Sequence, residues 1–277
     1  MTPTLAETAL PLFVPADRPD LYGRAFAAGA DAVIVDLEDA VAPDRKGEAR
    51  AALSMARETL AGAGCPVLVR VNAAATPWHA ADMAAVLALP LAGVVLPKAE
   101  SAAAVTAAAR GAGRPVVALV ESARGLAAAR EIAGAAARLA FGSIDYAADI
   151  GCAHSREALL GARAELVLAS RLAGLAGPLD GVTAACGKAA AAEVEDDASY
   201  AAALGFGGKL LIHPVQIDPA RAGFGPTPQE LAWAERILAA SPDGGAAALD
   251  GAMIDAPVRL RAEGIMRRAA TTGGPSR

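Results

Sequence analysis

The sequence predicts an α/β protein, a TIM (β/α)8 barrel followed by a C-terminal helical lid extension. Three observations lead to this prediction. Eight short apolar runs alternate with helical patterns along the chain. Nearly all of these runs are continuously apolar, which is how strands buried on both faces read. The length of 277 residues also suits a single barrel domain.

The apolar runs define the expected strands, and the segments between them define the expected helices. The strands are predicted at Leu10–Val14, Ala32–Leu37, Val67–Val71, Gly93–Leu96, Val116 to Glu121, a run ending at Asp145, Pro178–Cys186 and Gly208–Ile212. The helices are predicted at about residues 18–28, 43–61, 78–87, 101–110, 126–137, 155–175 and 193–203. An open doubly wound sheet is the alternative, but the first turn reads PADRPD and lacks its G-x-G-x-x-G.

The chain is expected to divide into a catalytic barrel domain, residues 1–225, and a C-terminal extension, residues 226–277. After the last strand we expect a loop at 220–228, a helix at Gln229–Ala239, a flexible stretch at 241–257, a helix at Val258–Ala270 and a disordered polar tail at 271–277. A barrel does not need this C-terminal portion. We therefore expect a lid or a subunit contact.

Composition excludes several classes of protein. The net charge of -5 and a pI near 5.3 argue against a nucleic-acid partner, which would need a basic face. No run reaches the roughly 18 apolar residues of a membrane span, and the N-terminus does not resemble a signal peptide. Cys65, Cys152 and Cys186 lack a metal-like spacing and suggest reduced thiols in a cytoplasmic protein.

Polar residues gather at one end of the expected strands. The chemistry of barrel enzymes sits at the C-terminal ends of the strands, whereas here the N-terminal ends carry mostly Gly, Ala and Pro. This asymmetry is the strongest functional indication from the residues alone. The residues at the C-terminal ends are Glu38, Asp39, Arg70, Asn72, Lys98, Glu121, Asp145, Asp180 and His213.

Glu121 and Asp145 are the candidate metal ligands. They follow the two strands of one βαβ unit, so they should stand side by side at the same edge of the sheet. Two carboxylates held together favour a shared proton or a cation, and Mg²⁺ takes one or two carboxylates plus waters. The alternative is a pair of solvated or helix-capping acids. His213, before Pro214, suggests a cap rather than a ligand.

Three basic residues are candidates for substrate binding, each with a structural alternative. Arg70 is placed to fork a substrate carboxylate, or to pair with Glu38 or Asp39. Lys98 could form a Schiff base, although a salt bridge to a neighbouring acid is favoured. Arg18, at the first strand–helix turn, could meet phosphates or simply lie on the surface.

Eight short motifs are spread along the chain: LFVPADRPD, AVIVDLEDAVAPDRK, VLVRVN, GVVLPKAES, ALVESARG, FGSIDYAADIG, KLLIHPVQI and GAMIDAP. Together they resemble the citrate lyase beta-subunit-like family, within the HpcH/HpaI aldolase and malyl-CoA lyase group. The likeness spans about Leu10 to Pro257. One departure is Ala16, where relatives often carry Gly, and it affects the expected phosphate contacts.

The resemblance implies a TIM barrel, usually trimeric, that binds Mg²⁺ and makes or breaks a C–C bond beside a thioester. By resemblance, Glu121 and Asp145 are the metal ligands and Arg70 clamps the substrate carboxylate. Glu38 and Asp39 correspond to active-site acids. Asp255 corresponds to a catalytic acid/base that some relatives deliver from a neighbouring subunit.

The sequence immediately around Asp255 allows two interpretations. Asp255 stands between Ile254 and Pro257, where an apolar setting would raise its pKa, but Asp-x-Pro equally fits the N-cap of the final helix.

The leading hypothesis is a Mg²⁺-dependent lyase that cleaves or forms a malyl-, citramalyl- or citryl-CoA thioester to give a 2-oxo acid and an acyl-CoA. The alternatives are a malyl-CoA-type thioesterase, a malate synthase-like activity, or a non-catalytic CoA-ester-binding subunit. We expect a homotrimer or an assembly of trimers.

Overall fold

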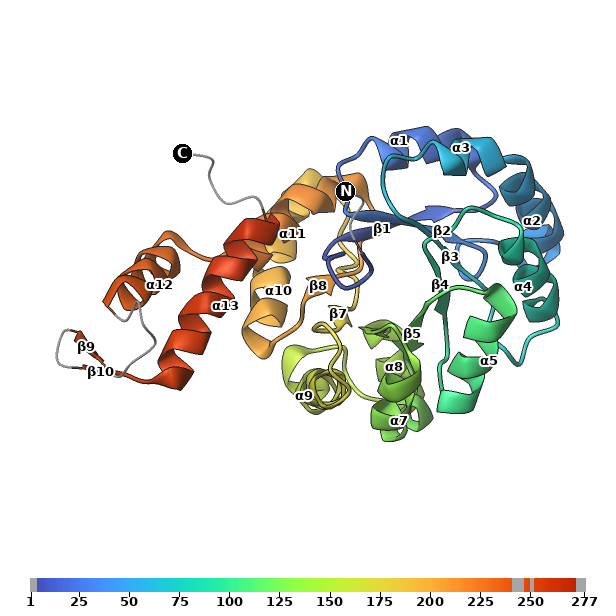
Figure 1. Ribbon diagram of the computed structural model, residues 1–277. Helices are drawn as coiled ribbons and strands as arrows, with labels where there is room; N and C mark the ends of the chain where they lie inside the picture. Colours follow the sequence, from blue (N-terminus) through green and yellow to red (C-terminus); the bar gives the residue numbers. More distant parts are fainter. Residues whose placement is uncertain (1–3, 241–246, 250–251, 273–277) are drawn as a thin grey trace.

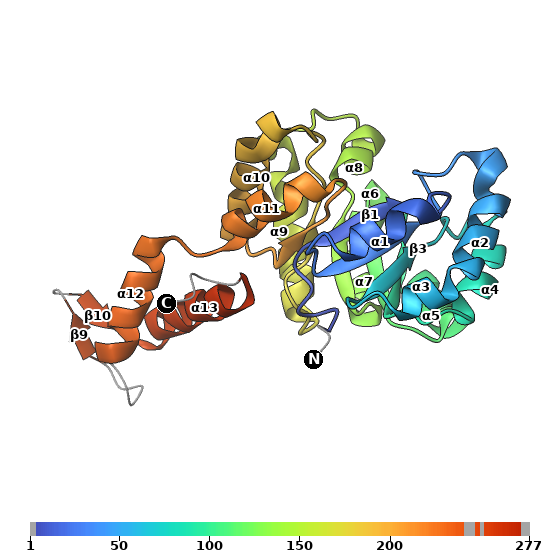
Figure 2. The same cartoon turned by 90° about the horizontal axis from the view of Figure 1, so that it is seen from above.

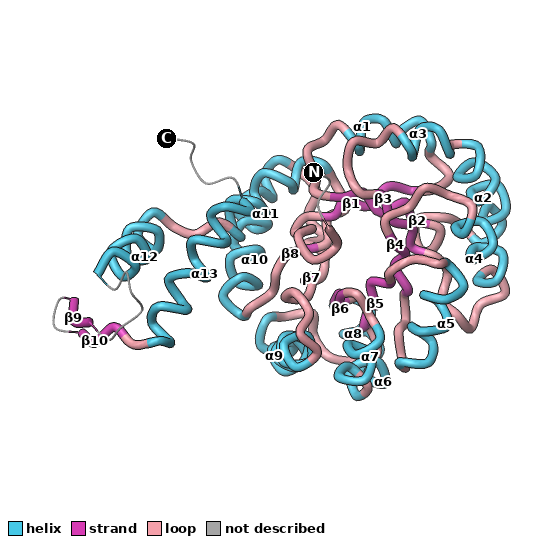
Figure 3. Tube along the Cα trace, viewed as in Figure 1, coloured by secondary structure: helices cyan, strands magenta, loops and turns pink. Residues whose placement is uncertain are grey.

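The computed structural model describes residues 4–240, 247–249 and 252–272, most of which form a barrel of eight parallel strands (Figures 1 and 3). The strands pair in chain order. The two ends of the sheet meet where Leu12 pairs with Leu211, whose N–H donates to the carbonyl of Pro11. The predicted TIM barrel is therefore confirmed. The strands are β1 (Pro11–Pro15), β2 (Ala32–Asp36), β3 (Val67–Arg70), β4 (Gly93–Leu96), β5 (Val116–Val120), β6 (Arg138–Phe141), β7 (Leu179–Asp180) and β8 (Gly208–Lys209).

Helices connect the strands and cover the outside of the barrel (Figure 1). Ser101, Ser122 and Ser155 each cap one of them, because the serine hydroxyl accepts a backbone N–H of the first turn. No helix in the described part of the chain combines the length and apolarity that crossing a membrane requires. The helices are η1 (Pro19–Leu21), α1 (Tyr22–Phe26), η2 (Pro43–Arg45), α2 (Lys46–Met55), α3 (Arg57–Ala61), α4 (His79–Leu87), α5 (Ala102–Ala112), α6 (Ala123–Ala127), α7 (Ala129–Ala135), α8 (Ser143–Ile150), α9 (Arg156–Leu172), η3 (Lys188–Ala190), α10 (Ala191–Leu204), η4 (Pro214–Gln216) and α11 (Ile217–Phe224).

The strands carry two apolar layers, because successive side chains point to opposite faces. One layer fills the barrel, and the other packs between the strands and the helices. In β2, for example, Ile34 belongs to the interior and Val33 and Val35 to the outer layer. The interior layer consists of Ala32, Ile34, Leu68, Val95, Val117, Leu119, Ala140, Leu179 and Leu210.

The same alternation selects the polar residues at the mouth of the barrel. Asp36 is two residues beyond Ile34, Arg70 two beyond Leu68, and Glu121 two beyond Leu119. Each continues the inward-facing side of its strand at the C-terminal end. The barrel core therefore places a ring of charged side chains directly above its last apolar layer.

The C-terminal extension lies beside the barrel, next to α10 and α11, in both views (Figures 1 and 2). It contains α12 (Pro228–Ala240), β9 (Ala247–Leu249), β10 (Ala252–Ile254) and α13 (Ala256–Thr272). α13 contacts α11, while β9, β10 and the start of α13 lie at the end away from the barrel. The extension has a small core of its own, made of Ala234, Ile237, Ile254, Ala262 and Ile265.

The sixth strand differs from its prediction. β6 ends at Phe141, and Gly142 (φ -86°, ψ 71°) turns the backbone so that α8 begins at Ser143. Asp145 therefore enters the barrel mouth from the first turn of a helix, not from a strand end. The prediction that RLAFGSID forms a single strand was wrong. Ile144 is apolar, so the apolar pattern continued past Gly142 and hid the end of the strand.

Three predictions for the C-terminal part also need correction. The loop expected at 220–228 is largely the end of α11, which buries Ile217, Ala220 and Phe224 on one face. The stretch expected to be flexible contains the antiparallel pair β9 and β10. Thr271 and Thr272, expected in a disordered tail, belong to α13; the rest of that expected tail, residues 273–277, lies outside the described residues.

Candidate active site

A cavity of about 430 Å³ opens at the C-terminal ends of the strands. Its charged lining residues are Asp36, Asp39, Arg70, Glu121 and Asp145. Its apolar lining includes Phe13, Leu119, Ile144, Val182, Leu210 and Ile212, and Phe13 lies against the Arg70 guanidinium. The cavity therefore combines acids and one guanidinium with hydrocarbon surface.

Asp36 and Arg70 form the buried centre of the charged side. They are directly opposite in the β2–β3 register. Arg70 donates from Nε to Oδ1 of Asp36 at 2.8 Å and from Nη2 to Oδ2 at 2.6 Å. Burial works to lower the pKa of Arg70, but the hydrogen bond and charge of Asp36, with Glu38 and Asp39, raise it well above its usual range. The guanidinium therefore stays charged, and the two hydrogen bonds to Asp36 fix it in one plane.

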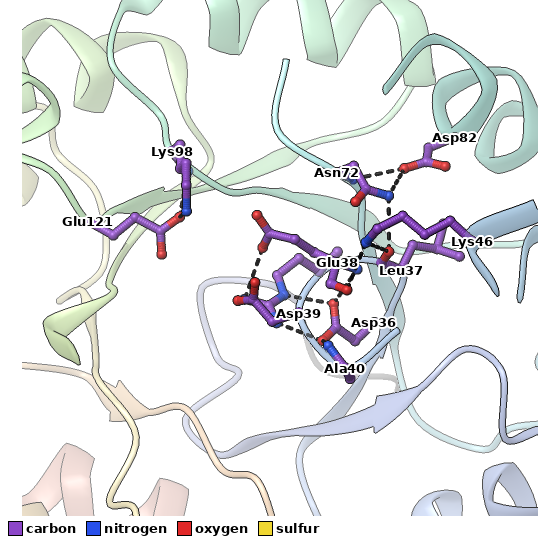
Figure 4. A network of polar contacts seen from close by, with 11 residues as sticks. Asp36, Leu37, Glu38, Asp39, Ala40, Lys46, Asn72, Asp82, Lys98 and Glu121 are labelled. Atoms are coloured by element: carbon purple, nitrogen blue, oxygen red, sulfur yellow. Dashed lines mark hydrogen bonds and ion pairs between the residues drawn. The ribbon is translucent and has the colours of Figure 1, made fainter. Parts of the chain in front are cut away.

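The loop after β2 is held by its own backbone contacts (Figure 4). Asp36 accepts the N–H of Glu38 at 2.9 Å and of Ala40 at 3.1 Å. The buried Lys46 ammonium donates to the carbonyls of Leu37 and Glu38 at 3.0 and 2.9 Å. These contacts fix the backbone from which the side chains of Glu38 and Asp39 extend.

The carboxyl group of Glu38 is buried, and few contacts stabilise its negative charge. Its Oε2 lies 3.1 Å from Nη1 of Arg70, but the angles do not make a hydrogen bond, so this oxygen has no hydrogen-bond partner among the described residues. Burial raises the pKa of Glu38 to about 8, and Arg70 only partly opposes this. Near neutral pH, and without a further cation, Glu38 therefore carries a proton.

Glu121 is held by Lys98 on one side. The backbone N–H of Lys98 donates to Oε1 of Glu121 at 2.7 Å, and the ammonium lies 3.7 Å from the same oxygen (Figure 4). Lys98 has φ 46°, the one positive φ of a non-glycine residue in the described chain. Such strain persists where the surroundings impose it, often at functional sites. The predicted alternative for Lys98, a salt bridge to a neighbouring acid, is what the structure has.

Gly142 confines Glu121 on the other side. A Cβ at position 142 would lie 2.4 Å from both Cβ and Oε2 of Glu121. Burial raises the pKa of Glu121 to about 7; the charge and N–H of Lys98 lower it, and Asp145 raises it. A hard divalent cation between these two carboxylates would relieve that cost.

The arrangement suits a cation that keeps some of its ligands as water or substrate oxygens. No group of three or more His, Cys, Asp or Glu side chains in the described chain could hold a metal ion. Two carboxylates with open positions match the coordination habit of Mg²⁺, not that of a closed structural zinc site. His213 caps η4, accepting the N–H of Val215 at 3.2 Å, as its alternative reading expected.

The structure brings together most of the predicted site residues and leaves two apart. Glu38, Asp39, Arg70, Lys98, Glu121 and Asp145 meet at the barrel mouth. Arg18 does not line the cavity, and its guanidinium forks Asp20 at 2.9 and 2.8 Å. Asp255 is exposed, and its Oδ1 accepts the N–H of Val258 at 3.1 Å, which is the expected N-cap of the last helix.

Two residues important to the site were missed from the sequence. Asp36 was not among the candidate residues, yet it lines the cavity and accepts hydrogen bonds from Nε and Nη2 of Arg70. Counting two residues forward from the inward-facing Ile34 and Leu68 would have placed both side chains at the barrel mouth, although not their pairing. Gly142 offered no comparable signal, because its role depends on where the Glu121 side chain lies.

Comparison with known proteins identifies the family. Residues 10–214 match the model of the HpcH/HpaI aldolase/citrate lyase family. The chain belongs to this family. It is 41% identical over 272 residues to a citrate lyase subunit beta-like protein of Mycobacterium tuberculosis, covering 93% of this chain and 94% of that one.

Other members of the family are named for different activities. A (3S)-malyl-CoA thioesterase of Cereibacter sphaeroides is 34% identical over 254 residues, covering 88% of each chain. The crystal structure of CitE from M. tuberculosis with magnesium, acetoacetate and coenzyme A matches with a TM-score of 0.84 and 38% identity. The match covers 96% of this chain and 100% of that one.

Gly142→Ala should destabilise the protein by about 1–3 kcal/mol, because the new methyl group overlaps the Glu121 side chain. Urea unfolding of the metal-free protein measures this change. Gly134→Ala is the matched control, since its Cβ would meet nothing within 4 Å in α7 and should be neutral or slightly stabilising. Equal stability of the two variants would mean that Glu121 has room to move.

Glu38→Gln should raise the melting temperature of the EDTA-treated protein at alkaline pH. The pKa of Glu38 in the folded protein is about 8, above its ordinary value of 4.5. The stability that the bound proton contributes is therefore complete below pH 4.5 and is lost as the pH rises through 8. The amide cannot ionise and avoids that loss. We expect a gain of at least ~2 °C at pH 9 and none near pH 4.5; a gain independent of pH would contradict the shifted pKa.

Proposed function

We propose that this chain is a Mg²⁺-dependent carbon–carbon lyase of CoA thioesters. It would cleave, or in reverse form, the bond between C2 and C3 of a 3-hydroxy di- or tricarboxyl thioester, giving a 2-oxo acid and an acyl-CoA. The observation that carries the proposal is that Glu121, Asp145 and Arg70 line one cavity at the barrel mouth. Paired acids and a guanidinium suit a metal-bound hydroxy acid with a free carboxylate.

Glu121 and Asp145 would hold the Mg²⁺. Related proteins of M. tuberculosis have been solved in complex with magnesium and acetoacetate, pyruvate or oxaloacetate, which supports a magnesium site in this family. When bound, Mg²⁺ acts as a Lewis acid toward the oxygens of the substrate. Lys98 and Gly142 hold the Glu121 carboxylate in one position.

Arg70 would bind the free carboxylate of the substrate. Asp36 occupies Nε and Nη2, whereas Nη1 is shared with Asp39, whose side chain is 62% exposed. Because the Asp39 carboxylate is largely in water, whereas the Asp36 carboxylate is buried, a substrate anion would replace Asp39 more readily than Asp36. Arg18, 52% exposed at the end of β1, is similarly free to exchange Asp20 for a phosphate of CoA.

Cleavage requires one group to take the proton of the 3-hydroxyl and another to protonate the acyl carbon. Glu38, protonated near neutral pH, would be the proton donor within the barrel, and Asp39 would be a second active-site carboxyl group beside it. Asp255 would be the acid/base that a neighbouring copy delivers. The extension, residues 226–277, would then be a lid for a neighbour of the barrel domain, residues 1–225, in a homotrimer or an assembly of trimers.

A thioesterase is the second candidate, since some relatives are named for malyl-CoA thioester hydrolysis. A malate synthase-like condensation would use the same residues. A non-catalytic CoA-ester-binding subunit is less well supported, because it would have no use for buried acids with raised pKa values in a cavity.

The purified protein with Mg²⁺ and malyl-CoA should release glyoxylate and acetyl-CoA, identified by mass spectrometry. Malate and free CoA would instead indicate a thioesterase.

Glu121→Gln and Asp145→Asn should each reduce kcat/KM by at least about 100-fold and weaken Mg²⁺ binding in calorimetry while the fold persists. Unchanged Mg²⁺ affinity in both variants would exclude this metal site.

Asp255→Asn should lose most activity yet keep its stability, because Asn caps a helix about as well as Asp. Mixed oligomers with Glu121→Gln should then recover activity, since about a quarter of the sites combine an intact barrel with an intact neighbouring lid. Sedimentation would verify assembly. Wild-type turnover in Asp255→Asn would leave only the capping role, and the absence of recovery would place the lid over its own barrel.

A further inference from the structure

The helix that carries Asp145 begins without the usual side-chain cap. Ser101, Ser122 and Ser155 stand at the N-caps of α5, α6 and α9, and each accepts a backbone N–H of the first turn. The N-cap of α8 is Gly142, which has no side chain to accept such a bond. Asp145 lies in the first turn of α8. One candidate metal ligand therefore stands on a helix start that its own N-cap does not hold.

The packing of Glu121 prevents a capping side chain at position 142. The residues that cap helices well, namely Ser, Thr, Asp and Asn, all carry a Cβ. A Cβ on Gly142 would overlap both Cβ and Oε2 of Glu121. The space that one candidate ligand fills thus removes the cap from the helix that carries the other. A contact that holds the start of α8 must come from another part of the chain.

His154 makes such a contact. Oγ of Ser143, the first residue of α8, forms a hydrogen bond with Nε2 of His154 at 3.0 Å. The chain can return to this point because Gly151 (φ 71°) ends α8 in the left-handed conformation. Residues 151–154 then lead back toward the start of α8 before α9 begins at Arg156. This short loop ties the end of the helix to its beginning.

The Ser143 hydroxyl has little room to find another arrangement. On its other side, a Cβ at Gly181 would overlap the Ser143 Oγ, so the backbone of Gly181 lies close to this hydroxyl. Ser143 is 2% exposed, and water reaches it poorly. Without His154 the hydroxyl would be buried and would lack this partner, which favours a shift of the first turn of α8.

His154 reaches the active site through Ser143. Ser143 lines the cavity at the barrel mouth together with Glu121 and Asp145. His154 lines a separate cavity of about 180 Å³, between the start of α9 and α10, with Arg156 and Asp197. A substrate at the barrel mouth would therefore meet Ser143 and Asp145, whereas the imidazole stands behind them.

We propose that His154 is a positioning residue for the metal site, because its hydrogen bond to Ser143 fixes the first turn of α8 and the Asp145 carboxylate with it. The proposal rests on the proposed role of Glu121 and Asp145 as Mg²⁺ ligands. Removing a residue that orients a metal ligand typically costs about 10- to 100-fold in metal affinity. His154 acts through a neighbour of the ligand, so the lower end of this range applies.

Calorimetry of Mg²⁺ binding to the folded variants measures this role. His154 is exposed, so the protein should tolerate its replacement. His154→Ala should raise the Kd for Mg²⁺ about tenfold. His154→Gln should restore binding to within about threefold of wild type, because the amide can reach the place of Nε2 and bond to the Ser143 hydroxyl. A Gln variant as weak as the Ala variant would contradict the proposal.

His213→Ala is the matched control. His213 is also exposed, and its imidazole likewise makes one hydrogen bond, from the N–H of Val215 in η4. Its loss should leave the Kd for Mg²⁺ within about twofold of wild type, because it does not hold a ligand-bearing helix. An effect as large as that of His154→Ala would show that the response is not specific to α8.

A double-mutant cycle tests whether the effect passes through Ser143. Ser143→Ala should raise the Kd for Mg²⁺ about as much as His154→Ala does, and the double variant should bind no more weakly than either single variant. If the two effects multiply instead, His154 acts by another route and the proposal fails.

Thermal unfolding in EDTA separates positioning from stability alone. A melting temperature that falls in His154→Ala, while the folded protein still binds Mg²⁺ within about twofold of wild type, would overturn the proposal. Failure of the metal site itself gives a different result. Wild-type protein that does not bind Mg²⁺ would remove both the site and the proposal, whereas equal binding by wild type and His154→Ala would remove the proposal alone.

Discussion

The mouth of this barrel depends on the buried ion pair between Asp36 and Arg70. The pair joins β2 to β3 at their last paired residues, and Asp36 also accepts the N–H groups that turn the following loop. Removing one partner of a buried pair typically costs about 3–5 kcal/mol, because the other charge is left without compensation. The position of Glu38, the plane of the guanidinium and the charge of the cavity all follow from this contact.

A second constraint acts on Glu121, and it comes from the backbone. Lys98 adopts a left-handed conformation that brings its N–H to the carboxylate, and Gly142 leaves the space that the side chain fills. Neither contact depends on the chemistry of a neighbouring side chain. The carboxylate is thus oriented in advance, so a ligand meets it without paying to order it.

The strands could be predicted because runs buried on both faces have a plain sequence signal, and the list of strand-end polar residues included most of the site. The failures have physical causes. RLAFGSID continues an apolar pattern across Gly142, so the change from strand to helix, and the origin of Asp145, were hidden. The partner of Arg70 depends on register between strands, which single-strand patterns do not contain. The left-handed Lys98 is a tertiary effect, since lysine has no preference for that conformation.

Among its described residues, the extension has a small core of five buried side chains, and α13 contacts the barrel helix α11. Cooperative units open with free energies set by the apolar contacts that they contain, so we expect this unit to open more readily than the barrel, whose two apolar layers are larger. Amide hydrogen exchange should then be faster in α12 and α13 than in the strands, and proteases should cleave the extension first. The segment that carries Asp255 would then be lost before the barrel unfolds.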